Sequence, residues 1–297
     1  MHKRKSNFII GTWSLSGDYG KIQYKKITQT IDECIKNDFY EFDTAPTYGK
    51  GLIEKVLSRY KKENKNIKIN TKCGYNSKFE KTFNIKDIRI SIEKSLDLFE
   101  KINHLYLHNP RDEIRNWSAV LEVLNEYKNK GLISKIGISL AKDYFFNNEI
   151  LNKFDVVMDE FNILRSTNLR KIERLKPKFV ARSVFANGLL TKKKINQMKF
   201  TIGDHRKLWL KKNRIQAIEN QVEQIKQLFS NDLKLVSMNF LISLKNINKI
   251  IVGVKNKDHV KWLSQNILKL EKLKKNEIDQ IIKLNEDKFY NYKKNIY

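Results

Sequence analysis

The amino-acid sequence predicts a single (β/α)8 barrel, the TIM-barrel fold, with a further helix at the C-terminus. Short apolar runs alternate eight times with amphipathic stretches, which indicates parallel strands joined by helices. The chain has 297 residues, a usual length for one such barrel. Eight alternations are also the number that closes a parallel sheet on itself.

In the first half of the chain, each predicted strand is a short apolar run. Helices are predicted where apolar residues recur every three or four positions. The strands cover residues 8–12, 38–42, 67–71 and 104–107. The helices lie around residues 27–35, at 51–60, from 84–87 onward to Phe99, and around 119–127, with Asn37 and Gly131 as stop signals.

The second half continues the alternation, with strands at residues 134–138, 155–158, 179–184 and 249–252. Helices are predicted at 215–228, at 233–244 and from Asp258, and a polar, basic loop at 186–207 interrupts the rhythm. The tail after Leu270 is helical and then aromatic and basic, so we expect a helix packed across the barrel and a frayed end. We see no repeat, linker or domain boundary. The prediction is one domain, residues 1–297, with its core at 8–265 and a helical tail at 266–297.

The chain is strongly basic, with Lys+Arg 59 against Asp+Glu 33 and a formal net charge of +26. The lysines are spread over nearly every predicted helix, and no DNA- or RNA-binding motif accompanies them. We therefore expect no nucleic-acid partner. The positive field would still concentrate a phosphorylated cofactor or an anionic substrate near the protein.

Cysteine use and hydropathy indicate the compartment. Cys34 and Cys73 form neither a metal-type cluster nor a disulfide framework, which suggests a reducing cytosol, and no metal is expected. The basic start resembles a signal n-region, but the apolar run behind it stops at Gly11. No stretch approaches the length of a membrane span. We expect a cytoplasmic monomer or weak oligomer without membrane contact.

Ionisable side chains stand at the ends of three successive predicted strands. Asp43 ends the second strand, with Tyr48 in the loop beyond it, and Lys72 and His108 follow the third and fourth strands. Active sites of such barrels form at the C-terminal ends of the strands, so we expect these four side chains to meet. That arrangement has a chemical purpose only if the three strands are parallel neighbours.

Together the four groups make a proton-transfer device. Tyr48 can supply the proton that a developing alkoxide requires, but the unperturbed pKa of a phenol is about 10. A nearby Lys72 ammonium lowers that pKa, and Asp43 holds the ammonium charged and aimed. Neutral His108 can donate a hydrogen bond to the substrate oxygen and orient it.

Each of the four also has an ordinary explanation. A tyrosine after a strand can anchor a loop, a strand-end aspartate can cap a helix, a lysine can be solvated, and a histidine before Asn109-Pro110 can satisfy a turn. Singly, these explanations are the better ones. Four complementary groups at three adjacent strand ends are hard to obtain by chance, so the sequence favours a catalytic site.

The same residues carry a resemblance to a known family. The motif Asp43-Thr44-Ala45-x-x-Tyr48-Gly49, the strand-end Lys72 and the strand-end His108 resemble, in order and spacing, the tetrad of the aldo-keto reductases. Further matches are Gly11-Thr12-Trp13, Gly137-Ile138-Ser139 and Arg182-Ser183-Val184-Phe185, the last similar to a bacterial subgroup of that family. The resemblance covers roughly residues 8–265. It implies a barrel enzyme that moves hydride between a nicotinamide cofactor and a carbonyl.

The cofactor site implied by the resemblance differs from a Rossmann domain, because no G-x-G-x-x-G stands between a strand and a helix. Barrels hold phosphates with the loops after strands seven and eight, here residues 180–183 and 253–258, and with a helix N-terminus. The resemblance implies that Lys255 contacts the adenosine 2′-phosphate, so NADPH is the first choice and NADH the alternative. Lys255 and Lys257 can equally be a solvated helix start. The implied cofactor-binding residues are Gly11, Thr12, Ser139, Met158, Arg182, Ser183, Phe185, Lys255, Asn256 and His259.

Some of these positions depart from the family pattern. Ser139 fits a carboxamide contact, but Leu140 stands where Asn is usual, and Met158 stands where Gln is expected. Arg182 takes the place of a stacking Tyr in many relatives, and His259 aligns with an arginine common in NADPH-preferring members. Each lost amide hydrogen bond would cost about 1 kcal/mol, which loosens cofactor binding without abolishing it.

The substrate-binding residues implied are Trp13, Tyr19 and Asn109, in a pocket walled by residues 109–117 and 186–207. Trp13 is the strongest candidate, because a large apolar side chain after the first strand would pack against a carbonyl substrate. Ordinary core packing is the equal alternative for Trp13. Lys192, Lys193 and Lys194 would favour an anionic substrate, such as a sugar phosphate or nucleotide sugar, or form a solvated loop.

We therefore expect an NADPH-dependent reductase of an aldehyde or ketone, with a sugar derivative as one candidate. The alternative is a barrel that binds the cofactor and serves as a sensor or scaffold with little turnover, which Leu140 and Met158 support. A nucleic-acid binder rests on charge alone.

Overall fold

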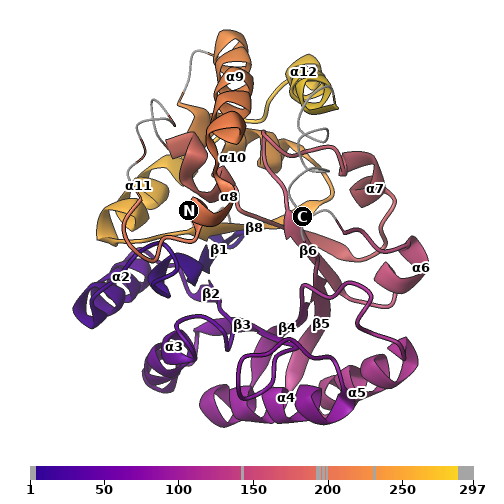
Figure 1. Cartoon of the computed structure of the whole chain (residues 1–297). Helices are drawn as coiled ribbons and strands as arrows, with labels where there is room; N and C mark the ends of the chain where they lie inside the picture. Colours follow the sequence, from indigo (N-terminus) through magenta and orange to yellow (C-terminus); the bar gives the residue numbers. More distant parts are fainter. Residues whose placement is uncertain are drawn as a thin grey trace.

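Eight parallel strands close into a barrel in which each strand pairs with its neighbour in the chain (Figure 1). The computed structural model describes residues 5–141, 144–191, 195, 198, 200–229 and 232–286. The strands are β1 (Phe8–Gly11), β2 (Glu41–Asp43), β3 (Lys68–Cys73), β4 (Ile102–His108), β5 (Ile133–Ser139), β6 (Val156–Glu160), β7 (Lys178–Arg182) and β8 (Ile247–Gly253). The predicted (β/α)8 barrel is confirmed.

The pairing register places the ends of the strands at one rim. Strand β1 closes the barrel against β8, with Gly11 opposite Gly253. Asp43 of β2 lies opposite Asn70 of β3, and Lys72 lies opposite Tyr106 of β4. Because neighbouring strands are parallel, their C-terminal ends gather on one side of the barrel.

The longer predicted helices are present outside the strands: α2 (Tyr24–Lys36), α3 (Leu52–Glu63), α4 (Ile85–Phe99), α5 (Trp117–Asn129), α9 (Lys212–Leu228), α10 (Leu233–Ser243) and α11 (Lys257–Ile267). Figure 1 shows them around the ring of strands. Asn84 caps α4 by accepting from Asp87 N, and Asn256 caps α11 by accepting from His259 N. No helix in the described ranges is both long and apolar enough for a membrane crossing.

The C-terminal helix α12 (Lys275–Glu286) packs against α9. Asn285 is fully buried there. Its Nδ2 donates to Ile163 O at 2.8 Å and to Ser166 Oγ at 2.7 Å, so the helix is tied to the loop after β6. The predicted tail helix is thus confirmed, whereas Phe289, Tyr290, Tyr292 and Tyr297 lie outside the described residues.

Two details differ from the prediction. Strand β2 begins at Glu41 rather than at residue 38, because Asp38 adopts a left-handed backbone (φ 60°) in the turn after α2. The chain also forms short helices that were not predicted: η1 (Trp13–Leu15), α6 (Asn148–Leu151), α7 (Leu169–Glu173), η2 (Ala186–Thr191) and α8 (Arg206–Trp209). One or two turns are too short to display helical periodicity.

The barrel interior is filled by its own small apolar cluster, distinct from the larger core between strands and helices. The cluster consists of Ile9, Tyr106, Val156, Met158, Val180 and Ile251. Tyr106 is so close to Gly137 that a Cβ there would lie 2.6 Å from its ring, so only glycine fits on β5 at this point. This packed layer forms the floor beneath the rim.

Candidate active site

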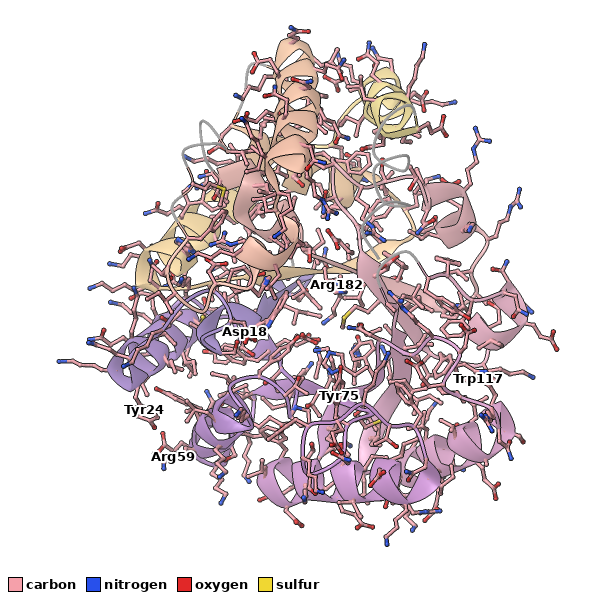
Figure 2. The ribbon with its side chains drawn as sticks, viewed as in Figure 1. Asp18, Tyr24, Arg59, Tyr75, Trp117 and Arg182 are labelled. Carbon is pink, nitrogen blue, oxygen red and sulfur yellow. The ribbon has the colours of Figure 1, made fainter. Side chains whose placement is uncertain are left out.

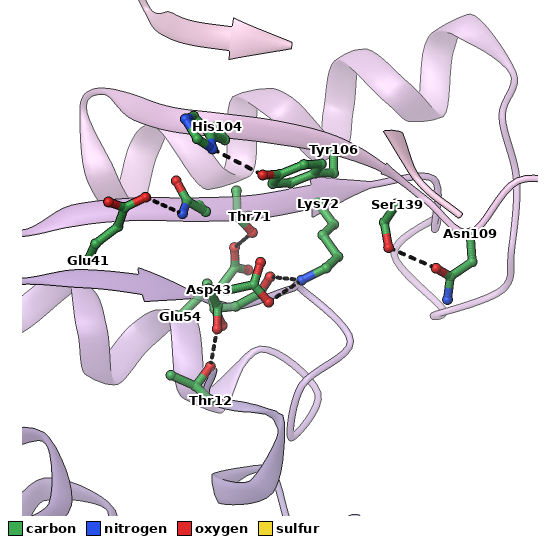
Figure 3. Close-up of polar contacts among 12 residues, drawn as sticks. Thr12, Glu41, Asp43, Glu54, Thr71, Lys72, His104, Tyr106, Asn109 and Ser139 are labelled. Carbon is green, nitrogen blue, oxygen red and sulfur yellow. Dashed lines mark hydrogen bonds and ion pairs between the residues drawn. The ribbon is translucent and has the colours of Figure 1, made fainter. Parts of the chain in front are cut away.

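The four residues predicted from the strand ends meet at the C-terminal rim. Lys72 and Asp43 form a buried ion pair, with Lys72 Nζ 2.7 Å from Asp43 Oδ1 (Figure 3). The same ammonium donates to the Thr44 carbonyl at 2.7 Å. Adjacent parallel strands deliver both side chains to this point, which is the spatial relation that the sequence required.

Tyr48 and His108 complete this group, which we call the rim cluster (Asp43, Tyr48, Lys72, His108). Lys72 Nζ lies 4.9 Å from the centroid of the Tyr48 ring. The rings of Tyr48 and His108 meet edge to face, with centroids 6.3 Å apart. All four residues line one cavity. A phenol, an ammonium, a carboxylate and an imidazole therefore share one pocket.

Burial governs the titration of the cluster. Burial raises the pKa of the Tyr48 phenol above its ordinary value, and the Lys72 ammonium offsets part of that rise. Lys72 thus acts in the predicted direction, but the expectation of a net lowering is corrected, because desolvation is the larger effect. Burial opposes the charge on Lys72, yet Asp43 and Tyr48 raise its pKa overall, so the ammonium stays charged.

His108 is held neutral. Burial lowers the pKa of its imidazole well below the ordinary value, and the charges of Lys72 and Arg182 act in the same direction. Its Nδ1 is buried and has no hydrogen-bond partner among the residues that the structure describes. A neutral imidazole carries one ring N–H and one free lone pair, so it can donate a hydrogen bond to a substrate oxygen without bringing charge.

The cavity has a volume of about 1580 Å³. Beside the rim cluster, the predicted residues that line it are Gly11, Trp13, Tyr19, Asn109, Ser139, Arg182, Ser183, Phe185, Lys255 and His259. They come from both sides of the barrel mouth, and Figure 2 shows Arg182 and Tyr75 near its centre, with Tyr24 and Arg59 on the outside.

Three predicted cofactor residues lie away from the cavity lining. Thr12 is fully buried and donates to the Asp43 carbonyl at 2.8 Å, so it braces β2. Met158 is fully buried in the cluster inside the barrel. Asn256 is occupied in capping α11. None of the three lines the cavity in the described part of the chain, and their contact with a cofactor stays a prediction.

Arg182 reaches over the cavity from the end of β7. Its Nη2 donates to Leu140 O at 3.0 Å. Its Nε is buried without a hydrogen-bond partner in the described part of the chain. Ser139 and Asn109 lie side by side, and the side-chain amide nitrogen of Asn109 donates to Ser139 Oγ at 3.0 Å and to Leu140 O at 3.1 Å. Ser183 and Asn109 both take left-handed backbones (φ 57° and 55°) that turn the chain at the rim.

Trp13 and Tyr19 form an aromatic wall beside the rim cluster. The Trp13 indole stacks on Tyr48 at 6.3 Å between centroids and meets the edge of Tyr19 at 5.2 Å. Its Nε1 donates to Asp18 Oδ2 at 2.6 Å, which fixes the ring. Trp13 is only partly buried, so it is a cavity wall rather than ordinary core.

Several lining residues were not predicted, among them Tyr75, Phe79, Lys234 and Trp262. Tyr75 meets the His108 ring edge to face at 5.2 Å. Lys234 and Trp262 belong to α10 and α11, where helical periodicity predicts a buried face but not a cavity. Lys192, Lys193 and Lys194 lie outside the described residues.

Comparisons with known proteins show which family and which solved structures the chain is similar to. The family model described as "Aldo/keto reductase family" matches residues 7–286. Over 112 residues the chain is 30% identical to an aldo-keto reductase of Pseudocercospora fijiensis, a match that covers 36% of this chain and only 38% of that relative.

Two solved structures resemble the whole barrel. The aldo-keto reductase AKR11C1 from Bacillus halodurans, in its holo form, superimposes with a TM-score of 0.76 at 20% identity, covering 94% of this chain and 91% of that one. The glycerol dehydrogenase AKR11B4 from Gluconobacter oxydans gives 0.74 at 19% identity, covering 94% and 90%. At such identities these likenesses establish the fold alone.

Proposed function

The chain belongs to the aldo/keto reductase family, and we propose that it is an NADPH-dependent reductase of aldehydes or ketones with Tyr48 as the proton donor. The observation that carries the proposal is the rim cluster. Its Lys72–Asp43 ion pair of 2.7 Å lies beneath the ring of Tyr48, in the same cavity as neutral His108. This combination suits proton delivery to a developing alkoxide.

The cavity fits a nicotinamide dinucleotide. Its volume of about 1580 Å³ exceeds the roughly 300–1,000 Å³ of ordinary small-molecule sites, which leaves room for a cofactor and a substrate together. Asp43 Oδ2 and Arg182 Nε are buried polar atoms without hydrogen-bond partners in the described ranges. Such atoms are costly unless a ligand or water satisfies them. They support a polar ligand at the rim.

The chain's own residues would perform the proton half of the reaction. A reduced nicotinamide held in the cavity would supply the hydride to the carbonyl carbon. The Tyr48 hydroxyl donates its proton to the carbonyl oxygen as negative charge develops there. The Lys72 ammonium stabilises the phenolate that remains, Asp43 fixes the ammonium, and a His108 N–H orients the oxygen.

The preference for NADPH rests on the Lys255 ammonium after β8 and on the neighbouring His259 of α11, whose protonation a bound phosphate would favour. Lys255 and His259 line the cavity. Lys255 Nζ donates to the Tyr19 carbonyl at 2.5 Å, which holds the ammonium at the edge of the cavity.

The aromatic wall of Trp13 and Tyr19 gives a carbonyl substrate an apolar surface. Sugar derivatives belong in the first panel of substrates to be tested. The buried free thiols of Cys34 and Cys73 suit a cytoplasmic location.

A fluorescence titration with NADPH and with NADH, followed by a screen of aldehydes, ketones and sugars, tests the proposal. We expect tighter binding of NADPH and oxidation of bound NADPH by at least one carbonyl class. Tight retention of the cofactor with no turnover on the whole panel would contradict a reductase and favour a sensing or scaffolding barrel. Tighter NADH binding would contradict only the cofactor preference.

A further inference from the structure

One end of the cavity is cationic and is formed by elements other than those that carry the rim cluster. We call it the far end and define it by Phe185, Lys234, Lys255, His259 and Trp262, which all line the cavity. These residues belong to α10, α11 and the segments after β7 and β8. Figure 1 shows these elements across the ring of strands from β3 and β4. A ligand that reached from the rim cluster to the far end would span the barrel mouth.

Lys234 is held at the far end by an aromatic ring. Its Nζ lies 4.2 Å from the centroid of the Trp262 indole. At this distance a cation is attracted by the face of the ring. The Phe185 ring packs edge-on against the same indole at 5.9 Å between centroids. Trp262 therefore fixes the position of the ammonium, although Lys234 and Trp262 are on different helices.

Lys234 has a carboxylate partner, but the ion pair is weak enough for the Lys234 ammonium to bind another anion. Lys234 Nζ lies 3.0 Å from Asp232 Oδ2, but the Asp232 side chain is 42% exposed. An ion pair with so exposed a partner is weak. A phosphate at the cavity wall would compete well for this ammonium, because charge-assisted bonds to phosphate are strong.

Neighbouring cations make the far end favourable for a multiply charged anion. Burial lowers the pKa of His259, and the charges of Lys234, Lys26 and Lys255 lower it further, whereas Asp258 acts in the opposite direction. Burial and nearby cations also lower the pKa of Lys255. A bound phosphate would relieve this mutual repulsion.

We propose that Lys234, positioned by Trp262, is a specificity-determining residue that binds the 2′-phosphate of an adenosine nucleotide at the far end. The inference rests on the proposed function, because it concerns the same cofactor. The proposed site for the 2′-phosphate thus contains Lys234 of α10 in addition to the residues of the loop after β8. Trp262 is the residue that positions Lys234.

The test measures binding of two adenosine fragments, 2′,5′-ADP and 5′-AMP, to the full chain by calorimetry at low salt. Lys234→Met keeps the stem packed on Trp262 and removes the charge. We expect this change to raise the Kd for 2′,5′-ADP about tenfold and to leave the Kd for 5′-AMP within about twofold, as fits the loss of one charge-assisted bond. Lys261→Met, on the exposed face of α11, is the matched control and should change neither.

A second pair of variants tests the positioning role of Trp262. Trp262→Leu removes the ring and should weaken the binding of 2′,5′-ADP but not that of 5′-AMP. Trp262→Phe keeps a ring and should retain most of this selectivity. If Trp262 only supported the local structure, both substitutions would weaken the binding of 2′,5′-ADP and of 5′-AMP together. The Leu and Phe variants would then not differ in selectivity.

The inference is overturned if Lys234→Met leaves the ratio of the two Kd values unchanged, or if Lys261→Met shifts it equally. Carbonyl reduction by the wild-type chain, measured in parallel, separates this failure from that of the proposed function. If the wild type reduces carbonyls and Lys234→Met leaves the ratio of the two Kd values unchanged, only the role of Lys234 is excluded. If the wild type binds neither fragment and neither dinucleotide, both proposals fall.

Discussion

Glu54 is a buried acid behind the strand that carries Lys72. It belongs to α3, where it accepts hydrogen bonds from Thr71 Oγ1 at 2.7 Å and Ser95 Oγ at 3.2 Å (Figure 3). Burial raises the pKa of this carboxyl to about 7, although the two hydroxyl groups and Lys72 act against the rise. The group is 4% exposed, so water does little to relieve the cost of its charge.

This raised pKa makes stability depend on pH. The folded chain holds a proton on Glu54 that the unfolded chain releases from about pH 4.5, so its contribution is fully present below pH 4.5 and is lost as pH rises through about 7. We expect Glu54→Gln to raise the free energy of unfolding at pH 8 by on the order of 3 kcal/mol, with little gain at pH 4.5. Denaturant unfolding at both pH values measures this.

Glu63→Gln, at the exposed end of the same helix, is the control and should show no such pH dependence. An equal effect of Glu54→Gln at the two pH values would mean that the carboxyl of Glu54 titrates normally.

The sequence predicted those site residues whose signal is local. Asp43, Lys72 and His108 each stand directly after a predicted strand, so the rule that active sites form at the C-terminal ends of barrel strands is enough to predict them. Glu54 and Lys234 carry no such signal. The role of Lys234 depends on Trp262, 28 positions later on another helix, and only the relative orientation of α10 and α11 brings the two together.

At the scale of elements, the loop after β1 is fastened to the segment after β7 beside the cavity. Tyr19 OH donates to Asn187 Oδ1 at 2.9 Å, and His205 N donates to Asp18 O at 2.8 Å. The Arg206 guanidinium lies 5.0 Å from the centroid of the Tyr19 ring. Two loops far apart in the sequence thus form one wall of the cavity.

Gly20 permits the close approach of these loops. A Cβ on Gly20 would lie 2.0 Å from Thr201 Oγ1, and its φ of +97° is left-handed. Gly20→Ala should push the loops apart, raise the Kd for NADPH severalfold and speed limited proteolysis between residues 200 and 209. Gly17→Ala is the matched control, because Gly17 has a φ of +98° but a Cβ there meets nothing within 4 Å.

Backbone strain alone costs about 1–2 kcal/mol in either variant. The effect on NADPH binding should therefore appear in Gly20→Ala only. Equal Kd values for the two variants would show that the approach of Thr201 has no bearing on the cavity.

The sequence also predicted elements unevenly. Helices of three or more turns, such as α2 and α4, were recognisable because their apolar faces repeat. The short helices α6, α7 and α8 were missed, since four or five residues span little more than one turn. Strand β2 was placed too early because Phe39 and Tyr40 are apolar, although they lie in the connection before the first strand residue, Glu41.

At the scale of the whole molecule, closure of the barrel turns separate sequence signals into one site. The rim cluster comes from β2, β3, β4 and the loop after β2, and the far end comes from α10, α11 and the segments after β7 and β8. The fold was predictable because eight alternations admit few arrangements. The cavity that joins the two ends was not, because it depends on side chains contributed from all around the mouth.

The proposed reaction depends on proton delivery by Tyr48, and the rate of carbonyl reduction by Tyr48→Phe measures that step. Phenylalanine keeps the ring beside Trp13 and Lys72 and removes only the hydroxyl. We expect a loss of about 100-fold or more in kcat, with the Kd for NADPH within about twofold of wild type. An unimpaired kcat in this variant would exclude Tyr48 as the proton donor.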